Sequence, residues 1–175
     1  MKKIVIVCGG IAGLIVSATM MLSTGMCYAS GNFEGSMLLG YASMVLAFSL
    51  VFVGIRNYRD KYNQGSISFG KAFKTGFFII LLASTMYVLV WLVNYYFFIP
   101  DFADKYSAYM LDKLKAGGAN QLEIDEQAKQ MARFNDLYKN PFFNALITYT
   151  EILPVGLLVT LVSALVLRRK PRPVA

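Results

Sequence analysis

One acidic side chain stands inside an otherwise apolar stretch near the end of the chain. Glu151 is the only charged residue between Lys139 and Arg168. A carboxylate within a membrane-spanning helix is costly, so it must find polar partners, face water or take up a proton. Asn144 and Thr148 lie seven and three residues before it, which places all three side chains on one helical face. This face is the first place to look for chemistry.

A second polar face lies in the preceding apolar stretch. Ser84, Tyr87, Trp91 and Asn94 follow one another at helical spacing. By helix rise, Asn94 lies about 8 Å and Glu151 about 13 Å from the outer boundary of their spans, so the two faces can meet. The sequence therefore predicts an intramembrane polar cluster, which comprises Glu151, Asn94, Tyr87, Asn144 and Thr148.

The predicted cluster has two interpretations. In the functional one, Glu151 handles protons or cations inside a polar cavity. In the structural one, Glu151 is a buried carboxyl that holds helices together through hydrogen bonds to Asn94, Tyr87 or a backbone carbonyl. Pro154 and Gly156 follow on the same stretch and predict a helix kink, either a hinge or a static bend.

The residue types exclude most known catalytic and cofactor chemistry. Histidine is absent, which removes the commonest metal ligand and any Ser–His or Cys–His pair. The two cysteines, Cys8 and Cys27, lie about 28 Å apart on one continuous helix and cannot form a disulfide with each other. We therefore expect no catalytic residue, no cofactor and no metal site. An intramembrane enzyme is a remaining alternative, without a visible nucleophile–base pair.

Four long stretches of low charge must position these residues. The chain has 175 residues, of which 57% are hydrophobic. About 20 apolar residues cross a hydrocarbon core, and four predicted spans meet this length: residues 4–26, 36–55, 72–99 and 141–167. The expected fold class is all-α, a polytopic four-helix transmembrane bundle forming a single membrane domain over residues 1–175. We expect the first span to remain uncleaved, because it exceeds a signal-peptide core.

The basic residues predict the orientation of the spans. Eleven of the 17 basic residues lie before the first span, in the segment 56–74 around the start of span three, or after span four. Cytoplasmic segments attract lysine and arginine, so both termini are predicted to be cytoplasmic. The basic residues crowd the ends of apolar spans, a distribution that argues against nucleic-acid binding. The lipid bilayer is the expected surrounding.

The connection between spans three and four is predicted to fold as a helical hairpin over residues 101–140. Phe102, Tyr106 and Met110 recur at four-residue spacing, as do Ile124 and Ala128. A run with two glycines at 116–120 separates the two helical faces. Under the predicted orientation, this hairpin is extracytoplasmic.

Several short segments, in this order, are similar to a known bacterial membrane family. They are GSISFGKAFK at 65–74, PDF at 100–102, YKNP at 138–141, EILPVGL at 151–157 and RRK at 168–170. On these segments the chain resembles the uncharacterised family DUF4199 over nearly its whole length. The resemblance implies a four-span protein of the bacterial inner membrane. It implies no activity, because the family has none assigned.

The function predicted from these features is a small non-enzymatic accessory, scaffold or envelope-interaction protein. Its partner is expected to be a membrane or envelope protein, or a second copy of the chain. Small residues at Gly9, Gly13 and Ser17 suit close helix packing, either within one chain or in a homo-oligomer. The alternative is a transporter or channel component that handles protons, cations or a small solute through the cluster around Glu151.

Overall fold

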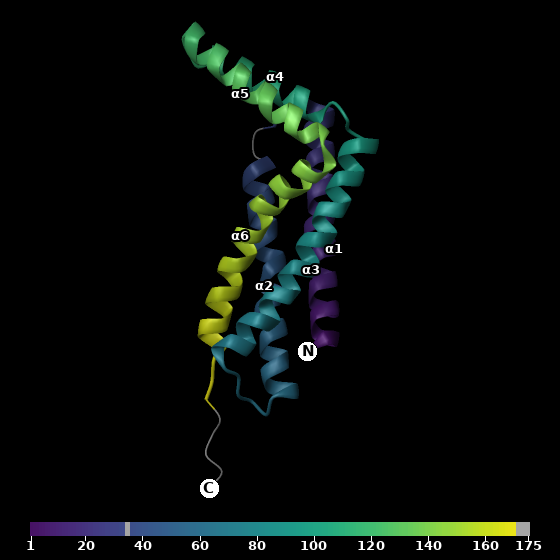
Figure 1. Cartoon of the computed structure of the whole chain (residues 1–175), viewed down its shortest axis with the longest axis vertical. Helices are drawn as coiled ribbons and strands as arrows, with labels where there is room; N and C mark the ends of the chain where they lie inside the picture. The colour runs from purple at the N-terminus through teal and green to yellow at the C-terminus, as the bar shows by residue number, and fades with distance from the viewer. Residues whose placement is uncertain (34–35, 171–175) are drawn as a thin grey trace.

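The computed structural model describes residues 1–33 and 36–170, and this part of the chain is helical (Figure 1). Six helices form in it: α1 (Lys2–Ser30), α2 (Ser36–Tyr62), α3 (Phe69–Phe97), α4 (Phe102–Ala116), α5 (Gln121–Lys139) and α6 (Pro141–Leu167). No β-strand forms among the described residues, although one isolated antiparallel bridge joins Ile67 to Arg169. The expected all-α fold class is confirmed.

Four of these helices are long and apolar enough to cross a membrane: α1, most of α2, α3 and α6. They pack side by side along the long axis of the molecule, while α4 and α5 lie at one end of them (Figure 1). In the figure α1 starts at the lower end, and α6 also ends there. We call this lower end the basic end and the end nearest α4 and α5 the aromatic end.

The helix boundaries follow from local capping groups. Ser68 caps α3 by accepting a hydrogen bond from the Lys71 backbone N–H at 3.4 Å. Asn140 accepts from the Phe142 N–H at 2.9 Å, and Pro141 occupies the first turn of α6. α1 ends where Gly31 takes a left-handed conformation with φ of 69°.

Three of the four predicted spans differ from the helices at their ends. α6 has the predicted bounds of 141–167. The second predicted span ends at residue 55, and α2 continues to Tyr62, because charged residues end an apolar stretch without ending a helix. α1 likewise continues to Ser30, and α3 occupies Phe69–Phe97 in place of 72–99.

Close helix contacts at glycines hold the basic half of the bundle together. A Cβ atom on Gly9 would lie 2.9 Å from the Ile79 carbonyl oxygen of α3. One on Gly156 would lie 2.5 Å from Ile80 Cγ2, and one on Gly76 would lie 2.7 Å from Thr160 Cγ2. Backbones approach this closely only where side chains are absent. The small residues of α1 and α6 therefore face the chain's own α3.

A short loop connects the helices at the basic end. Residues 63–68 connect α2 to α3 through a turn in which Gln64 and Gly65 both have positive φ. Two backbone hydrogen bonds, of 3.0 and 2.9 Å, join Ile67 of this loop to Arg169 after α6. Arg59 of α2 also donates to the carbonyl of Leu167 at 3.4 Å. These bonds tie α2, α3 and α6 at the same level.

Candidate functional site

Aromatic rings from distant parts of the chain meet at the aromatic end. Phe33, which follows α1, lies 5.4–5.6 Å between centroids from Phe102, Tyr106 and Tyr109 of α4. Phe102 in turn lies 5.6 Å from Trp91 of α3 in an edge-to-face arrangement. Such aromatic pairs contribute beyond the area they bury. They dock α4 onto the ends of α1 and α3.

A polar trio beside these rings fixes the start of α4. The Tyr28 hydroxyl donates a short hydrogen bond to the Asp101 carboxylate, which also pairs with Lys105 at 3.1 Å. The Lys105 ammonium lies 3.7 Å from the centroid of the Tyr28 ring. The hydrogen bonds from Tyr28 and Lys105 hold the pKa of Asp101 below its usual range.

Hydrogen bonds join α3, α5 and α6 around a buried indole. Trp91 Nε1 donates to Asn144 Oδ1 at 2.9 Å, and Thr148 Oγ1 donates to the Asn144 carbonyl at 2.8 Å. The Asn144 amide and the Tyr96 hydroxyl both donate to the carbonyl oxygen of Tyr138, at 3.5 and 2.7 Å. A buried polar group left without a partner is destabilising, so this network orients Trp91 and Tyr138.

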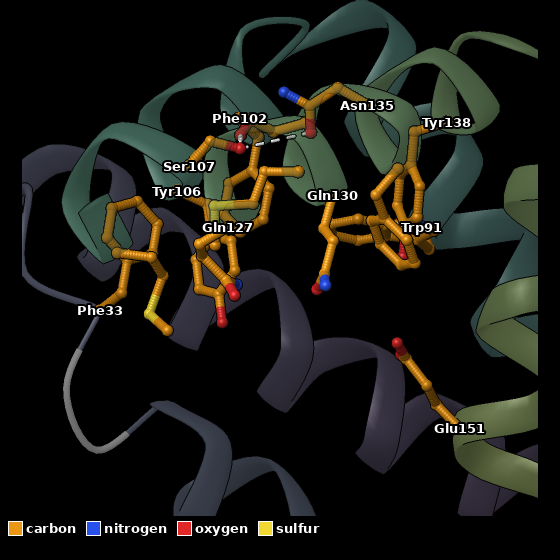
Figure 2. Close-up of a pocket in the computed structure, with 14 residues that line it drawn as sticks. Phe33, Trp91, Phe102, Tyr106, Ser107, Gln127, Gln130, Asn135, Tyr138 and Glu151 are labelled. Carbon is orange, nitrogen blue, oxygen red and sulfur yellow. Dashed lines mark hydrogen bonds between the residues drawn. The ribbon is translucent and has the colours of Figure 1, made fainter. Parts of the chain in front are cut away.

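A cavity of about 510 Å³ lies between the α4–α5 pair and the long helices. Figure 2 shows Glu151 pointing from α6 across this cavity toward Gln130 and Trp91. Its lining joins aromatic rings, two methionines, several polar side chains and one carboxylate: Phe33, Trp91, Phe102, Ala103, Tyr106, Ser107, Met110, Gln127, Gln130, Met131, Phe134, Asn135, Tyr138 and Glu151.

A second cavity, of about 250 Å³, shares part of this lining. Its further residues come mainly from α1, α2 and α3 and include Tyr41, Tyr87 and Thr148. The residues common to both cavities are Trp91, Phe102, Tyr138 and Glu151. Burial, and then the nearby carboxylate of Glu151, raises the pKa of the Tyr138 phenol.

The structure brings most of the predicted cluster together. Tyr87, Thr148 and Glu151 line the smaller cavity, and Asn144 is bonded to Thr148 beside it. Asn94 is buried and lines neither cavity. No hydrogen bond or ion pair joins Glu151 to another described residue. Its side chain lines both cavities.

The second half of the site comes from residues that the cluster prediction omitted. Phe102, Tyr106 and Met110 were predicted as the apolar face of a helix, and they form one wall of the larger cavity. Tyr138 belongs to the matching face of α5. The sequence indicated these residues, because the apolar face of a helix outside the spans is expected to pack against another part of the protein.

The predicted kink residues lie next to the site on α6. Pro154 stands inside the helix, three residues beyond Glu151, and is exposed. Gly156 is buried against Ile80 of α3. Close packing at Gly156 fixes the lower part of α6 just below the cavities.

Comparison with known proteins agrees with this architecture. The model of the family described as "Protein of unknown function (DUF4199)" matches residues 8–169. The chain belongs to the DUF4199 family. No curated protein and no solved structure matches the chain. The family match and the four apolar helices together support an uncharacterised membrane protein.

The chemical groups around the two cavities limit what the site of this DUF4199 protein can hold. No three acidic or cysteine residues in the described part of the chain lie close enough to hold a metal ion. Among the described residues that line either cavity, Glu151 is the one with a charge. The arrangement suits a molecule that fills an aromatic space and interacts with one carboxylate.

Proposed function

We propose that this DUF4199 protein is a non-enzymatic integral protein of the bacterial inner membrane, with an accessory, scaffold or envelope-interaction role. Both termini are cytoplasmic, and α4 and α5 form an extracytoplasmic hairpin that serves as the contact surface. One observation carries the proposal: of all the residues in these two helices, only Tyr138 is buried. A helix pair with so little buried surface has most of its side chains free for contacts outside the bundle.

The distribution of charge and aromatic residues supports the orientation. Exposed basic residues gather at the basic end: Arg56, Lys61, Lys71, Lys74, Arg168, Arg169 and Lys170. Exposed phenylalanines gather at the aromatic end: Phe97, Phe98, Phe142 and Phe143. Lysine and arginine favour the cytoplasmic side, and aromatic rings favour the membrane interface. The α4–α5 pair then lies on the opposite side from the basic end.

Labelling of single cysteines in intact cells tests this orientation. Lys115→Cys, in the exposed last turn of α4, is expected to react with a membrane-impermeant maleimide. Lys61→Cys, at the basic end of α2, is expected to react only after the membrane is opened. The native cysteines, Cys8 and Cys27, are both buried and provide the background. The reverse labelling pattern would refute the proposed orientation.

The outer part of the α4–α5 pair offers an apolar contact point. Leu122 in the first turn of α5 is 70% exposed, on a helix that is otherwise rich in charge. A large exposed apolar side chain outside the membrane spans is typical of a surface that meets another protein. The segment 101–140 that contains Leu122 also carries six basic and seven acidic residues.

Native mass spectrometry of the protein extracted from its own membrane in mild detergent tests the contact surface. We expect a stoichiometric protein partner, or a second copy of the chain, that Leu122→Ser releases. Tyr62→Ser, which removes another exposed large side chain at the basic end, is the matched control and should keep the partner. A strictly monomeric species without a protein partner would contradict the proposal.

The carboxylate between two cavities supports a second candidate function, as a transporter or channel component. In this case Glu151 handles protons, cations or a small solute, and several copies assemble because four spans are few for a carrier. Liposomes that contain the purified protein would show a flux that Glu151→Gln abolishes. An unchanged flux combined with lower thermal stability of Glu151→Gln would favour a structural role for the carboxyl.

A further inference from the structure

The two cavities at the aromatic end share a defined set of chemical groups. Trp91, Phe102 and Tyr138 each line both cavities, and Glu151 is the fourth shared residue. The rings belong to three helices, α3, α4 and α5, and the carboxylate belongs to α6. Aromatic rings and one carboxylate therefore belong to the lining of both a cavity of about 510 Å³ and one of about 250 Å³.

The charge of the lining selects among classes of ligand. An anion would face the Glu151 carboxylate, and no lysine or arginine is among the described residues that line either cavity. An uncharged apolar molecule would remove water from the carboxylate without pairing it, which is unfavourable. A bare metal ion needs several oxygen ligands, and the described lining offers one carboxylate with scattered amides and hydroxyls. An organic cation pairs the carboxylate and also fills the aromatic space.

The chain already uses this chemistry a short distance away. The Lys105 ammonium lies 3.7 Å from the Tyr28 ring centroid and 3.1 Å from the Asp101 carboxylate. One ring face and one carboxylate thus hold an ammonium group at the start of α4. In the cavities the same two kinds of group occur together, with more rings and with space in place of the lysine side chain. Cation–π attraction strengthens where water is excluded.

Hydrogen bonds around the residues that line both cavities orient the rings before any ligand binds. The Trp91 indole N–H donates its hydrogen bond to Asn144, which fixes the orientation of the ring. The same ring lines both cavities. The Tyr138 carbonyl accepts hydrogen bonds from Tyr96 and Asn144, which fixes the backbone of α5 at this point. Groups that are held in place in advance lose less freedom when a ligand binds.

We propose that the larger cavity at the aromatic end, of about 510 Å³, binds an organic ammonium ion, with Glu151 as its counter-ion and Trp91, Phe102 and Tyr138 as its aromatic walls. The volume is in the range of small-molecule sites in proteins. Binding requires neither transport of the cation nor a partner protein on α4 and α5. A negative result for cation binding would therefore leave the function proposed above unaffected, and the converse also holds.

Titration of the full-length protein in nanodiscs with choline tests the proposal. Trp91 is the single tryptophan of the chain and lines both cavities, so its fluorescence reports ligand entry directly. We expect a saturable fluorescence change with choline. The uncharged analogue 3,3-dimethylbutan-1-ol, which has the same shape, should bind at least about tenfold more weakly, because it lacks both the ion pair and the cation–π attraction.

Two matched variants locate the interaction. Glu151→Gln keeps the shape of the side chain and should weaken choline binding by about tenfold or more, because the variant lacks the charge that pairs with the cation. Glu126→Gln makes the same change on the exposed side of α5, outside both cavities, and should bind like the wild type. Circular dichroism establishes that each variant is folded before titration.

Three results would overturn the proposal. One is the absence of saturable choline binding by the folded wild type, measured by fluorescence and by calorimetry. The second is equal binding of choline and its uncharged analogue, which would indicate a site for neutral molecules. The third is unchanged choline binding by Glu151→Gln, which would place the cation elsewhere.

Discussion

The two halves of the helix bundle are built in opposite ways. In the basic half, glycines allow close helix contacts, with Gly9 against the Ile79 backbone and Gly156 against the Ile80 side chain. In the aromatic half, large rings and a carboxylate surround cavities of about 510 and 250 Å³. Beyond these glycine contacts, the basic end holds a cavity of about 610 Å³, with Lys71, Arg168 and Arg169 in its lining. The two ends thus differ in the groups that surround open space, which are cationic at the basic end and aromatic with one carboxylate at the aromatic end.

The largest expected effect comes from filling a contact of the basic half. In Gly9→Leu, the new Cβ would lie 2.9 Å from a backbone oxygen of α3, which a side-chain rotation cannot relieve. We expect a loss of about 3 kcal/mol in the free energy of unfolding, at the upper end of overpacking effects. Thermal denaturation in detergent, followed by circular dichroism, measures it.

The neighbouring glycine provides the control for this change. A Cβ atom on Gly10 has nothing within 4 Å. Gly10→Leu should therefore change the free energy of unfolding by no more than about 0.5 kcal/mol, as surface substitutions usually do. Equal losses for the two variants would show that the α1–α3 contact does not hold the bundle.

A smaller effect is expected from breaking the network of the aromatic half. Asn144→Leu leaves the buried Trp91 indole N–H without its acceptor, which should cost about 1–2 kcal/mol of unfolding free energy. The emission of Trp91 should also shift, because its hydrogen bond is lost. Thr150→Ala, on the exposed side of the same helix, should change neither quantity. An unshifted emission in Asn144→Leu would contradict the network.

The smallest expected effect is a dependence of stability on pH at the start of α4. The pKa of Asp101 is lowered in the folded protein by its hydrogen bonds to Tyr28 and Lys105. Its contribution to stability is therefore present above the ordinary carboxyl pKa of 3.8 and is lost as the pH falls through the lowered value. Melting temperatures of wild type and Asp101→Asn, measured from pH 7 downward, should converge in acid. Parallel curves would exclude the linkage.

Much of the fold could be predicted from the sequence because its signals are local. Asn140 and Pro141 mark the start of α6, and both bounds of this helix were predicted. The second predicted span ends at residue 55, whereas α2 continues to Tyr62, because apolar content predicts a membrane boundary and not the end of a helix. Ser68 caps α3 earlier than the start of its apolar run suggests.

The candidate site could be predicted only on the helices that carry its polar residues. Glu151, Thr148 and Tyr87 were assigned by spacing within α6 and α3, and they line one cavity. Asn94 fulfilled the same spacing rule but lines neither cavity, because one helical face is wider than the wall of a cavity. The place of Phe102 and Tyr138 in the site depends on how α4 and α5 pack against the bundle. Residue spacing along one helix does not predict this packing.

The turn between α4 and α5 has a practical consequence for imaging. Gly117 and Gly118 are exposed there, and Gly118 has φ of 79°. Exposed glycine turns commonly accept inserted sequence. A small epitope placed between these residues would recruit an antibody fragment, and the added mass would give electron microscopists a landmark for aligning images of a 19.5 kDa particle.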